Sequence, residues 1–366
     1  MESMESQALL TAIKIGAYAL PNRILMSPLT RSRANNPDSA PTALHAEYYA
    51  QRAGAGIIIT EGSQISEQAR GYAFTPGIHS AAQIAGWKQV TDAVHAKDGR
   101  IFIQLWHCGR ISHSYFHNGA APVAPSAIRA ESGNCFTDQG IVRPELPRAL
   151  TLAEIKAIIE DYRQAAKNAQ LAGFDGVQLH GANGYLVDQF LHESSNQRSD
   201  EYGGSLENRA RFLFEVLDAL LSVWGADKVA VRLSPSGIRG FDSVDVDPVS
   251  IFEYVIDQLN NYPLAFLELV EPLDPVTDKP QMVQKVAPHF RPFYRGTLVS
   301  NGGYTQETAN QAIQAGIADA IAFGKAFIAN PDLPTRFARN APLNAWNQAT
   351  FYGGTAVGYT DYPALV

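Results

Sequence analysis

The sequence predicts an α/β protein built as one (β/α)8 TIM barrel. Short runs rich in apolar and β-branched residues recur eight times along the 366 residues, and helical patterns lie between many of them. Several runs are apolar at nearly every position, which is typical of parallel strands buried on both faces. Alternating strands and helices over this length favour a barrel.

The strand runs lie, in chain order, at 23–29, 56–60, 100–107, 176–180, 228–235, 264–270, 297–301 and 319–324. The expected helices lie at 80–99, 151–173, 208–224, 249–261 and 305–315. Ser80 with Gln83, and Thr151 with Glu154, have the spacing of a capping box. Gly99 and Gly173 are the expected helix ends.

Two further segments complete the predicted barrel. Residues 12–24 are expected to form an N-terminal hairpin that closes the barrel bottom. Residues 107–150 are rich in Gly, Pro, Ser and Asn, so we expect a long capping excursion over the barrel top after the third strand. Residues 1–366 are thus expected to form a single domain.

A doubly wound parallel sheet is the alternative fold. Its usual signature is GxGxxG directly after a strand. Here the glycine-rich stretch AGAG, at 53–56, precedes its strand instead.

Composition and charge limit the classes of partner and the compartment. The net charge of −7 and a pI near 5.7 argue against nucleic acid or an anionic membrane as main partner. No apolar run approaches the roughly 18 residues of a membrane span, and no signal peptide is expected at the N-terminus. Cys108 and Cys135 are the two cysteines, too few for a disulfide framework. A soluble cytoplasmic protein is expected.

Polar residues and glycines stand at or just beyond the predicted strand ends. In chain order they are Thr30, Glu61, Gly62, Gln104, Trp106, His180, Arg232, Asn301, Gly302, Gly303, Gly324 and Lys325. In a TIM barrel these ends meet on the face that carries active sites. A single Gln or Thr there commonly satisfies only loop backbone. Arg232 needs an anionic or polar partner if it is buried, and glycines after the last two strands are typical of a phosphate site.

The stretch HGANGY, at 180–185, places His180, Asn183 and Tyr185 at the end of an apolar strand. A histidine there can simply cap the next turn. A metal site is a weaker alternative, because the spacing of His107, His113 and His117 fits no compact zinc pattern. No metal is expected.

Several long motifs together resemble the Old Yellow Enzyme family of FMN-dependent ene-reductases. They include GRIFIQLWHCGRISH, HGANGYLVDQFLHESSNQRSDEYGGSLENRARF and AFGKAFIANPDLPTRF. The resemblance covers nearly the whole chain and looks closest to the bacterial N-ethylmaleimide and nitrate-ester reductase branch. The segment SSNQRSDEYGGSLENRARF is expected to be structural, with its Arg and Asp residues pinning the loop into the next helix.

The resemblance implies non-covalent FMN, reduced by NADPH, with NADH as the possible other donor. Cofactor binding is implied for Pro28, Leu29, Thr30, Gly62, Gln104, Arg232, Asn301, Gly302, Gly303, Gly324 and Lys325. Thr30 matches the partner of the flavin C4 carbonyl, Gln104 and Arg232 the partners of its pyrimidine edge, and the last five residues the phosphate cradle. Relatives usually carry arginine at the position of Lys325, and lysine lacks the planar bidentate fork.

The resemblance also implies a reaction, in which hydride passes from reduced flavin to the β-carbon of an activated alkene such as an enone, maleimide or nitroalkene. By the same resemblance, His180 and Asn183 are expected to bind the substrate oxygen and stabilise the enolate, and Tyr185 is expected to protonate the α-carbon. Tyr72, Trp106 and Tyr352 match aromatic walls of the substrate pocket. Nitrate esters and nitroaromatics are further candidate substrates, and phenols candidate inhibitors.

Other functions remain open at this point. One is a flavin-binding protein without turnover, against which the complete set of His180, Asn183 and Tyr185 argues. Another is a metal-dependent barrel hydrolase, which would be colourless. The sequence leaves open the natural substrate, the choice between NADPH and NADH, and whether the protein is a monomer or a homodimer.

Overall fold

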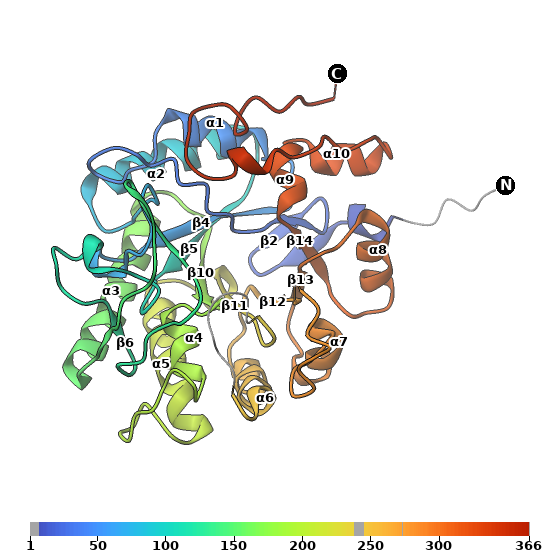
Figure 1. The fold of residues 1–366 in the computed structure, drawn as a ribbon. Coiled ribbons are helices and arrows are strands. Elements are labelled where there is room, and N and C mark those ends of the chain that lie inside the picture. The colour runs from blue at the N-terminus through green and yellow to red at the C-terminus, as the bar shows by residue number, and fades with distance from the viewer. Residues whose placement is uncertain (1–6, 238–244, 273, 366) are drawn as a thin grey trace.

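The structure, a computed structural model, describes residues 7–237, 245–272 and 274–365. Within these residues eight parallel strands close into a barrel, in which β3 pairs with both β4 and β14. The barrel strands are β3 (Ile24–Met26), β4 (Ile57–Gln64), β5 (Ile101–Trp106), β10 (Gly176–Gly181), β11 (Val229–Leu233), β12 (Phe266–Val270), β13 (Leu298–Asn301) and β14 (Ala320–Phe323). Figure 1 shows these strands at the centre with helices around them. The closed barrel confirms the predicted fold and rules out the doubly wound sheet.

The described residues contain ten α-helices, which are α1 (Ala43–Gln51), α2 (Ala81–His95), α3 (Leu152–Leu171), α4 (Leu186–Leu191), α5 (Leu206–Leu221), α6 (Pro248–Gln258), α7 (Val286–Phe290), α8 (Gln306–Gln314), α9 (Lys325–Ala329) and α10 (Leu333–Ala338). Of these, α2 and α3 begin directly after Ser80 and Thr151, the caps that the sequence predicted, and both capping boxes are present. Within the described ranges, no helix has both the length and the apolar character needed to cross a bilayer.

Some predicted boundaries were wrong. Helix α2 ends at His95 rather than at Gly99, because Asp98 already takes the left-handed conformation, with φ of 58°. Helix α5 begins earlier than residue 208, since Ser205 is its cap and accepts a hydrogen bond from the Asn208 amide. Strand β4 runs beyond residue 60 to Gln64, and its pairing with β5 shifts register on the way.

The predicted hairpin is confirmed as β1 (Ile13–Ile15) and β2 (Tyr18–Leu20), which pair antiparallel. Its turn requires a glycine, because a Cβ at Gly16 would lie 2.0 Å from the Asp227 carbonyl oxygen. Ile15 and Leu20 are buried in one cluster with the inward side chains of the lower barrel. The hairpin therefore fills the end of the barrel at which the strands begin.

Residues 107–150 lie between β5 and α3. They contain two small sheets, in which β6 (Val123–Ala124) pairs with β9 (Arg148–Ala149) and β7 (Cys135–Thr137) pairs with β8 (Gly140–Val142). The β7–β8 hairpin contacts the barrel through Phe136, whose carbonyl accepts a hydrogen bond from the Ala73 amide.

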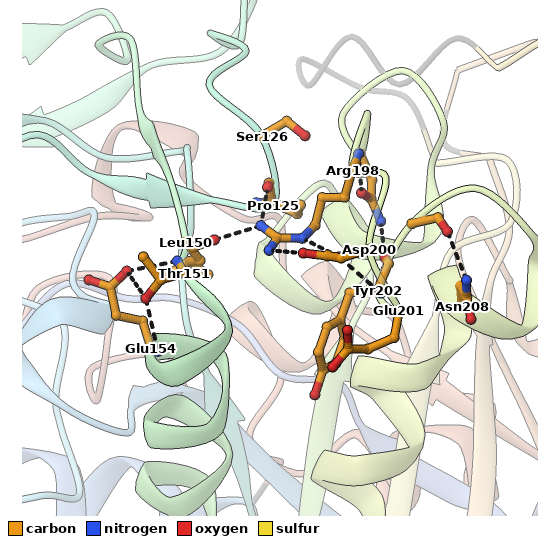
Figure 2. Close-up of polar contacts among 12 residues, drawn as sticks. Pro125, Ser126, Leu150, Thr151, Glu154, Arg198, Asp200, Glu201, Tyr202 and Asn208 are labelled. Carbon is orange, nitrogen blue, oxygen red and sulfur yellow. Dashed lines mark hydrogen bonds and ion pairs between the residues drawn. The ribbon is translucent and has the colours of Figure 1, made fainter.

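The motif around Arg198 attaches this excursion to the barrel. Arg198 donates to the carbonyls of Pro125 and Leu150, at 2.8 and 2.6 Å, and forms an ion pair with Asp200 (Figure 2). A shallow cavity of about 520 Å³ lies beside these residues. Because the guanidinium is already bonded to protein groups, we read this motif as structural, as the sequence predicted, although its partners lie largely in the excursion.

Candidate active site at the barrel mouth

A chain of hydrogen-bonded polar side chains crosses the inside of the upper barrel. Gln104 of β5 donates to Gln178 of β10 at 2.8 Å, and Gln178 donates to Glu268 of β12 at 2.6 Å. Arg232 of β11 donates from Nε to Glu268 at 3.1 Å and from Nη2 to Asn301 of β13 at 2.9 Å. The five side chains come from adjacent strands of the closed sheet, so barrel closure brings them together.

These hydrogen-bonded side chains include the anionic or polar partner that Arg232 was expected to need if it is buried. Glu268, which is fully buried, is an anionic partner of Arg232 within the protein. Sequence reasoning missed Glu268 and Gln178, although Glu268 is the single polar residue of β12 and Gln178 interrupts the apolar run that precedes His180 in β10. Among the described residues, Arg232 bonds through Nε and Nη2, so its Nη1 group remains to donate to a ligand.

His180 lies beside Arg232 in the β10–β11 register and is buried at the mouth. Burial, helped by the charge of Arg232, lowers the pKa of His180 well below its ordinary value. The imidazole is therefore neutral, with one N–H donor and one acceptor nitrogen. Its Nδ1 is buried without a hydrogen-bond partner among the described residues. An unpartnered buried polar atom in this position fits a group that binds a ligand.

Asn183 and Tyr185 follow His180 in a turn. Asn183 has φ of 61°, a left-handed conformation that asparagine tolerates better than most residues, and its amide donates to Ser234 Oγ at 2.7 Å. The Tyr185 hydroxyl lies 3.2 Å from that of Tyr72. Burial raises the pKa of Tyr185 above its ordinary value, so its hydroxyl is protonated at neutral pH.

Aromatic rings form one wall of the mouth. Trp106 stacks on Tyr72 with ring centroids 5.5 Å apart, Tyr72 on Phe136 at 6.2 Å, and Phe136 on Tyr352 at 5.9 Å. Phe136 was missed by the sequence analysis, because it comes from the irregular excursion. Gly62 packs under this wall, since a Cβ there would lie 2.7 Å from the Trp106 ring.

The loops after β3, β13 and β14 border the mouth on another side. Pro28, Leu29 and Thr30 lie just beyond β3, and all three are half-buried. Gly302 and Gly303 have φ of 121° and 72°, so both need glycine.

Two open positions in these loops fit a phosphate cradle. A Cβ added at Gly303 would meet nothing within 4 Å, and one at Gly324 would meet only Leu29. Space beside exposed backbone amides after the last two strands is what a bound phosphate requires. Lys325 is exposed, with Nζ 5.8 Å from the centre of the Trp346 ring.

The three histidines of the excursion each contact a different group of the protein. His107 Nδ1 accepts from the Gly109 amide at 3.0 Å, His113 pairs with Glu145 at 3.1 Å, and His117 lies 2.8 Å from Ser112 Oγ. Burial lowers the pKa of His107 to about 3. In the described part of the chain, no group of three or more His, Cys, Asp or Glu side chains is placed to hold a metal ion.

Comparison with known proteins gives three lines of likeness. The family model "NADH:flavin oxidoreductase / NADH oxidase family" matches residues 8–344. The chain is 44% identical to 12-oxophytodienoate reductase 1 of Oryza sativa subsp. japonica over 361 residues, which is 98% of this chain and 93% of that protein.

Solved structures show similarity to the same group of enzymes. The structure of morphinone reductase in complex with tetrahydroNAD is 47% identical, covers 98% of both chains and superposes with a TM-score of 0.92. The Old Yellow Enzyme homologue from Zymomonas mobilis is 45% identical, with a TM-score of 0.93, and covers 98% of this chain and all of its own (100%).

Proposed function

The chain belongs to the NADH:flavin oxidoreductase family, that of Old Yellow Enzyme, and from this premise we propose that it is an FMN-dependent ene-reductase. Its substrates are activated alkenes such as enones, maleimides and nitroalkenes, with nitrate esters and nitroaromatics as further candidates. The observation that carries the proposal is the grouping of His180, Asn183 and Tyr185 at the barrel mouth, beside Arg232.

The residues at the mouth fit an FMN molecule. Gln104 and Arg232 each retain hydrogen-bonding groups that can hold the pyrimidine edge, and Thr30 can donate to the C4 carbonyl. The open positions at Gly303 and Gly324, with Gly302, Asn301 and Lys325 beside them, fit the phosphate. Pro28, Leu29 and Gly62 would pack against the ring system. When bound, FMN supplies the hydride that is added to the alkene.

His180 and Asn183 hold the substrate oxygen. A neutral imidazole N–H and an amide N–H can both donate to a carbonyl or nitro oxygen, and these donors stabilise the negative charge that grows there as the β-carbon accepts hydride. Since neither donor is charged, this stabilisation comes from fixed dipoles in a buried site. The walls formed by Tyr72, Trp106 and Tyr352 orient an apolar substrate body.

Tyr185 delivers the proton to the α-carbon. Its hydroxyl stays protonated at neutral pH, and its bond to Tyr72 fixes the direction in which it points. An enolate carbon is basic enough to take a proton from a phenol. A positioned acid transfers this proton faster than solvent does.

Further details belong to the same proposal. NADPH is the proposed reductant, with NADH as the alternative, and phenols are proposed as inhibitors that place a phenolate oxygen between His180 and Asn183. We propose a single domain whose top is covered by residues 107–150, acting as a monomer or homodimer. Cytoplasmic location is supported by Cys108 and Cys135, both free and buried.

A comparison of two half-reactions of Tyr185→Phe tests the function. Reduction of the bound flavin by NADPH needs no proton from Tyr185, so we expect its rate to stay nearly unchanged. Reoxidation by 2-cyclohexenone does need it, and losing a positioned acid costs about 10²–10⁴-fold. Nitroalkenes that yield a stable nitronate should be affected much less.

Tyr162→Phe is the matched control, because its buried hydroxyl on α3 has no hydrogen-bond partner among the described residues. Stopped-flow spectroscopy measures both half-reactions. Equal slowing of both in Tyr185→Phe would assign the tyrosine to packing. A purified protein that binds no FMN, even in excess, would refute the function and favour the colourless hydrolase.

A further inference from the structure

A buried cluster of Asp188, His192 and Asp245 lies behind the turn that carries Asn183 and Tyr185. His192 Nδ1 is 2.8 Å from Asp245 Oδ2, and its Nε2 is 3.4 Å from Asp188 Oδ1. All three side chains are at most 4% exposed. The proposed chemistry does not use any of these groups.

The cluster is bonded directly to the turn. Asp188 Oδ2 accepts from the Gly184 amide at 2.7 Å, and Gly184 has φ of 78°, next to Asn183 at 61°. Two successive left-handed residues form a turn that needs support from its surroundings. Asp188 gives that support at the amide that directly follows Asn183.

On its far side, the cluster is held by Asp245, which lies shortly before α6. Asp245 Oδ1 accepts from the Ser194 amide at 2.8 Å, and Ser234, just after β11, accepts from the Asn183 amide. Two described residues therefore hold the turn, Ser234 directly and Asp245 indirectly through His192 and Asp188.

The charges within the cluster of Asp188, His192 and Asp245 attract one another. Burial alone would lower the pKa of His192, but the charges of Asp188 and Asp245 and their contacts with the ring outweigh burial and raise this pKa to about 10. Burial would raise the pKa of Asp245, but the contact with His192 lowers it to about 2. One imidazolium between two carboxylates thus persists across the neutral range.

Other charged groups lie farther out. Arg209 of α5 is buried with its Nη2 3.6 Å from Glu193, and it is in electrostatic reach of Asp247 at the start of α6. The Phe252 ring of α6 covers the imidazole, at a centroid distance of 5.6 Å.

We propose that His192 is a positioning residue: as a buried cation between Asp188 and Asp245, it fixes the Asn183–Gly184 turn so that the side-chain amide of Asn183 points at the substrate oxygen. The inference rests on the proposed function for the role of Asn183. It goes beyond that function because His192 touches neither substrate nor cofactor.

His192→Gln removes the cation and retains a polar side chain. With FMN-loaded protein, we expect 4-chlorophenol binding, followed by its long-wavelength charge-transfer band, to weaken about tenfold. In an Asn183→Ala background the same substitution should have almost no effect on phenol affinity, because His192 acts through Asn183. Amide hydrogen exchange at residues 182–187 should quicken in His192→Gln.

Asp332→Asn is the matched control, since it breaks another largely buried ion pair, with Arg336 in α10, away from the mouth. It should lower thermal stability without changing phenol affinity or exchange at 182–187. If His192→Gln is not recovered folded, Asp245→Asn, which removes one charge at constant size, takes its place in the same measurements.

The outcomes separate the two proposals. If His192→Gln lowers stability but leaves phenol affinity and amide hydrogen exchange at 182–187 unchanged, the positioning role is overturned. Equal weakening with and without Asn183 would overturn it as well. If the wild type itself gives no phenol band and reduces no enone, the proposed function fails, and exchange at the Gly184 amide alone then decides whether the cluster holds the turn.

Discussion

At the end where its strands begin, the barrel is filled with apolar side chains, whereas at the other end the same strands present hydrogen-bonded polar groups. The change takes two residues along a strand. Phe102 is followed on the same face by Gln104 in β5, and Phe266 by Glu268 in β12. Because side chains alternate between faces with a period of two, both members of each pair point into the barrel.

The barrel thus places the residues that stabilise it and the residues that are proposed to bind a ligand at opposite ends. The apolar side chains of the lower end pack tightly against the hairpin β1–β2 and exclude water. The volume of each side chain therefore decides which residues fit there. The upper layer holds a buried charge pair, which is tolerable because each group has partners. Substitutions in the lower layer should therefore change stability, and those at the upper end should change binding.

The largest expected effect comes from breaking the oxygen-binding pair at the upper end. His180→Ala combined with Asn183→Ala removes two hydrogen bonds to a charged oxygen, each worth roughly 1.5–3 kcal/mol. We expect phenol affinity, measured by titration of the charge-transfer band, to fall by roughly 10²–10⁴-fold. Thermal unfolding should change little. Unchanged phenol affinity would mean that the site lies elsewhere.

The next effect is at the lower end. Phe102→Ala opens a cavity in the apolar layer and should lower the free energy of unfolding by about 3–5 kcal/mol. Denaturant titration measures this loss, and phenol affinity of the folded fraction should be unchanged. Phe136→Ala is the contrasting control, because that ring is 40% exposed at the mouth and its loss should affect ligand binding more than stability. A reversed pattern would contradict the separation of the two ends.

A pH effect of about 3 kcal/mol is expected from Glu61, a buried carboxyl on β4. Burial raises its pKa to about 7, against hydrogen bonds from the Arg31 amide and the Tyr49 hydroxyl. Below pH 4.5 this carboxyl is protonated in both folded and unfolded chains. Between pH 4.5 and 7 only the folded chain keeps the proton, so its contribution makes unfolding easier as pH rises, and the effect levels off above pH 7.

Glu61→Gln removes this titration. We expect its unfolding free energy to depend less on pH than that of the wild type in this window, by chemical denaturation at several pH values. Identical slopes for the two proteins would show that Glu61 does not titrate there.

The smallest effect concerns Lys325, which is exposed at the rim of the upper end. If its ammonium meets the FMN phosphate as a single charge, Lys325→Ala should loosen FMN and Lys325→Arg should tighten it, each by about 0.2–1 kcal/mol. Fluorescence titration of the apoprotein with FMN gives the dissociation constants. Three equal constants would show that Lys325 makes no contact with the phosphate.

The sequence alone was sufficient to place the barrel strands, the helices α2, α3, α5, α6 and α8, and the candidate catalytic turn. Strand runs and capping boxes depend on backbone preference and burial over a few residues, so the pattern around Ser80 or Thr151 was enough to place a helix start. The turn of Asn183 and Tyr185 was found in the same way, from polar residues directly after an apolar strand. Helix ends were less certain, as Gly99 shows, because another residue can take the left-handed position.

The contacts between polar groups, in contrast, depend on the tertiary fold. Gln178 and Glu268 are 90 residues apart, and His192 and Asp245 are 53 apart, yet each pair is in hydrogen-bond contact. Phe136 likewise reaches the aromatic wall from an irregular segment. Local periodicity records which side of a strand or helix is buried, but not the partner it meets there. That partner is set by closure of the barrel, which brings strands from distant parts of the chain into adjacent positions.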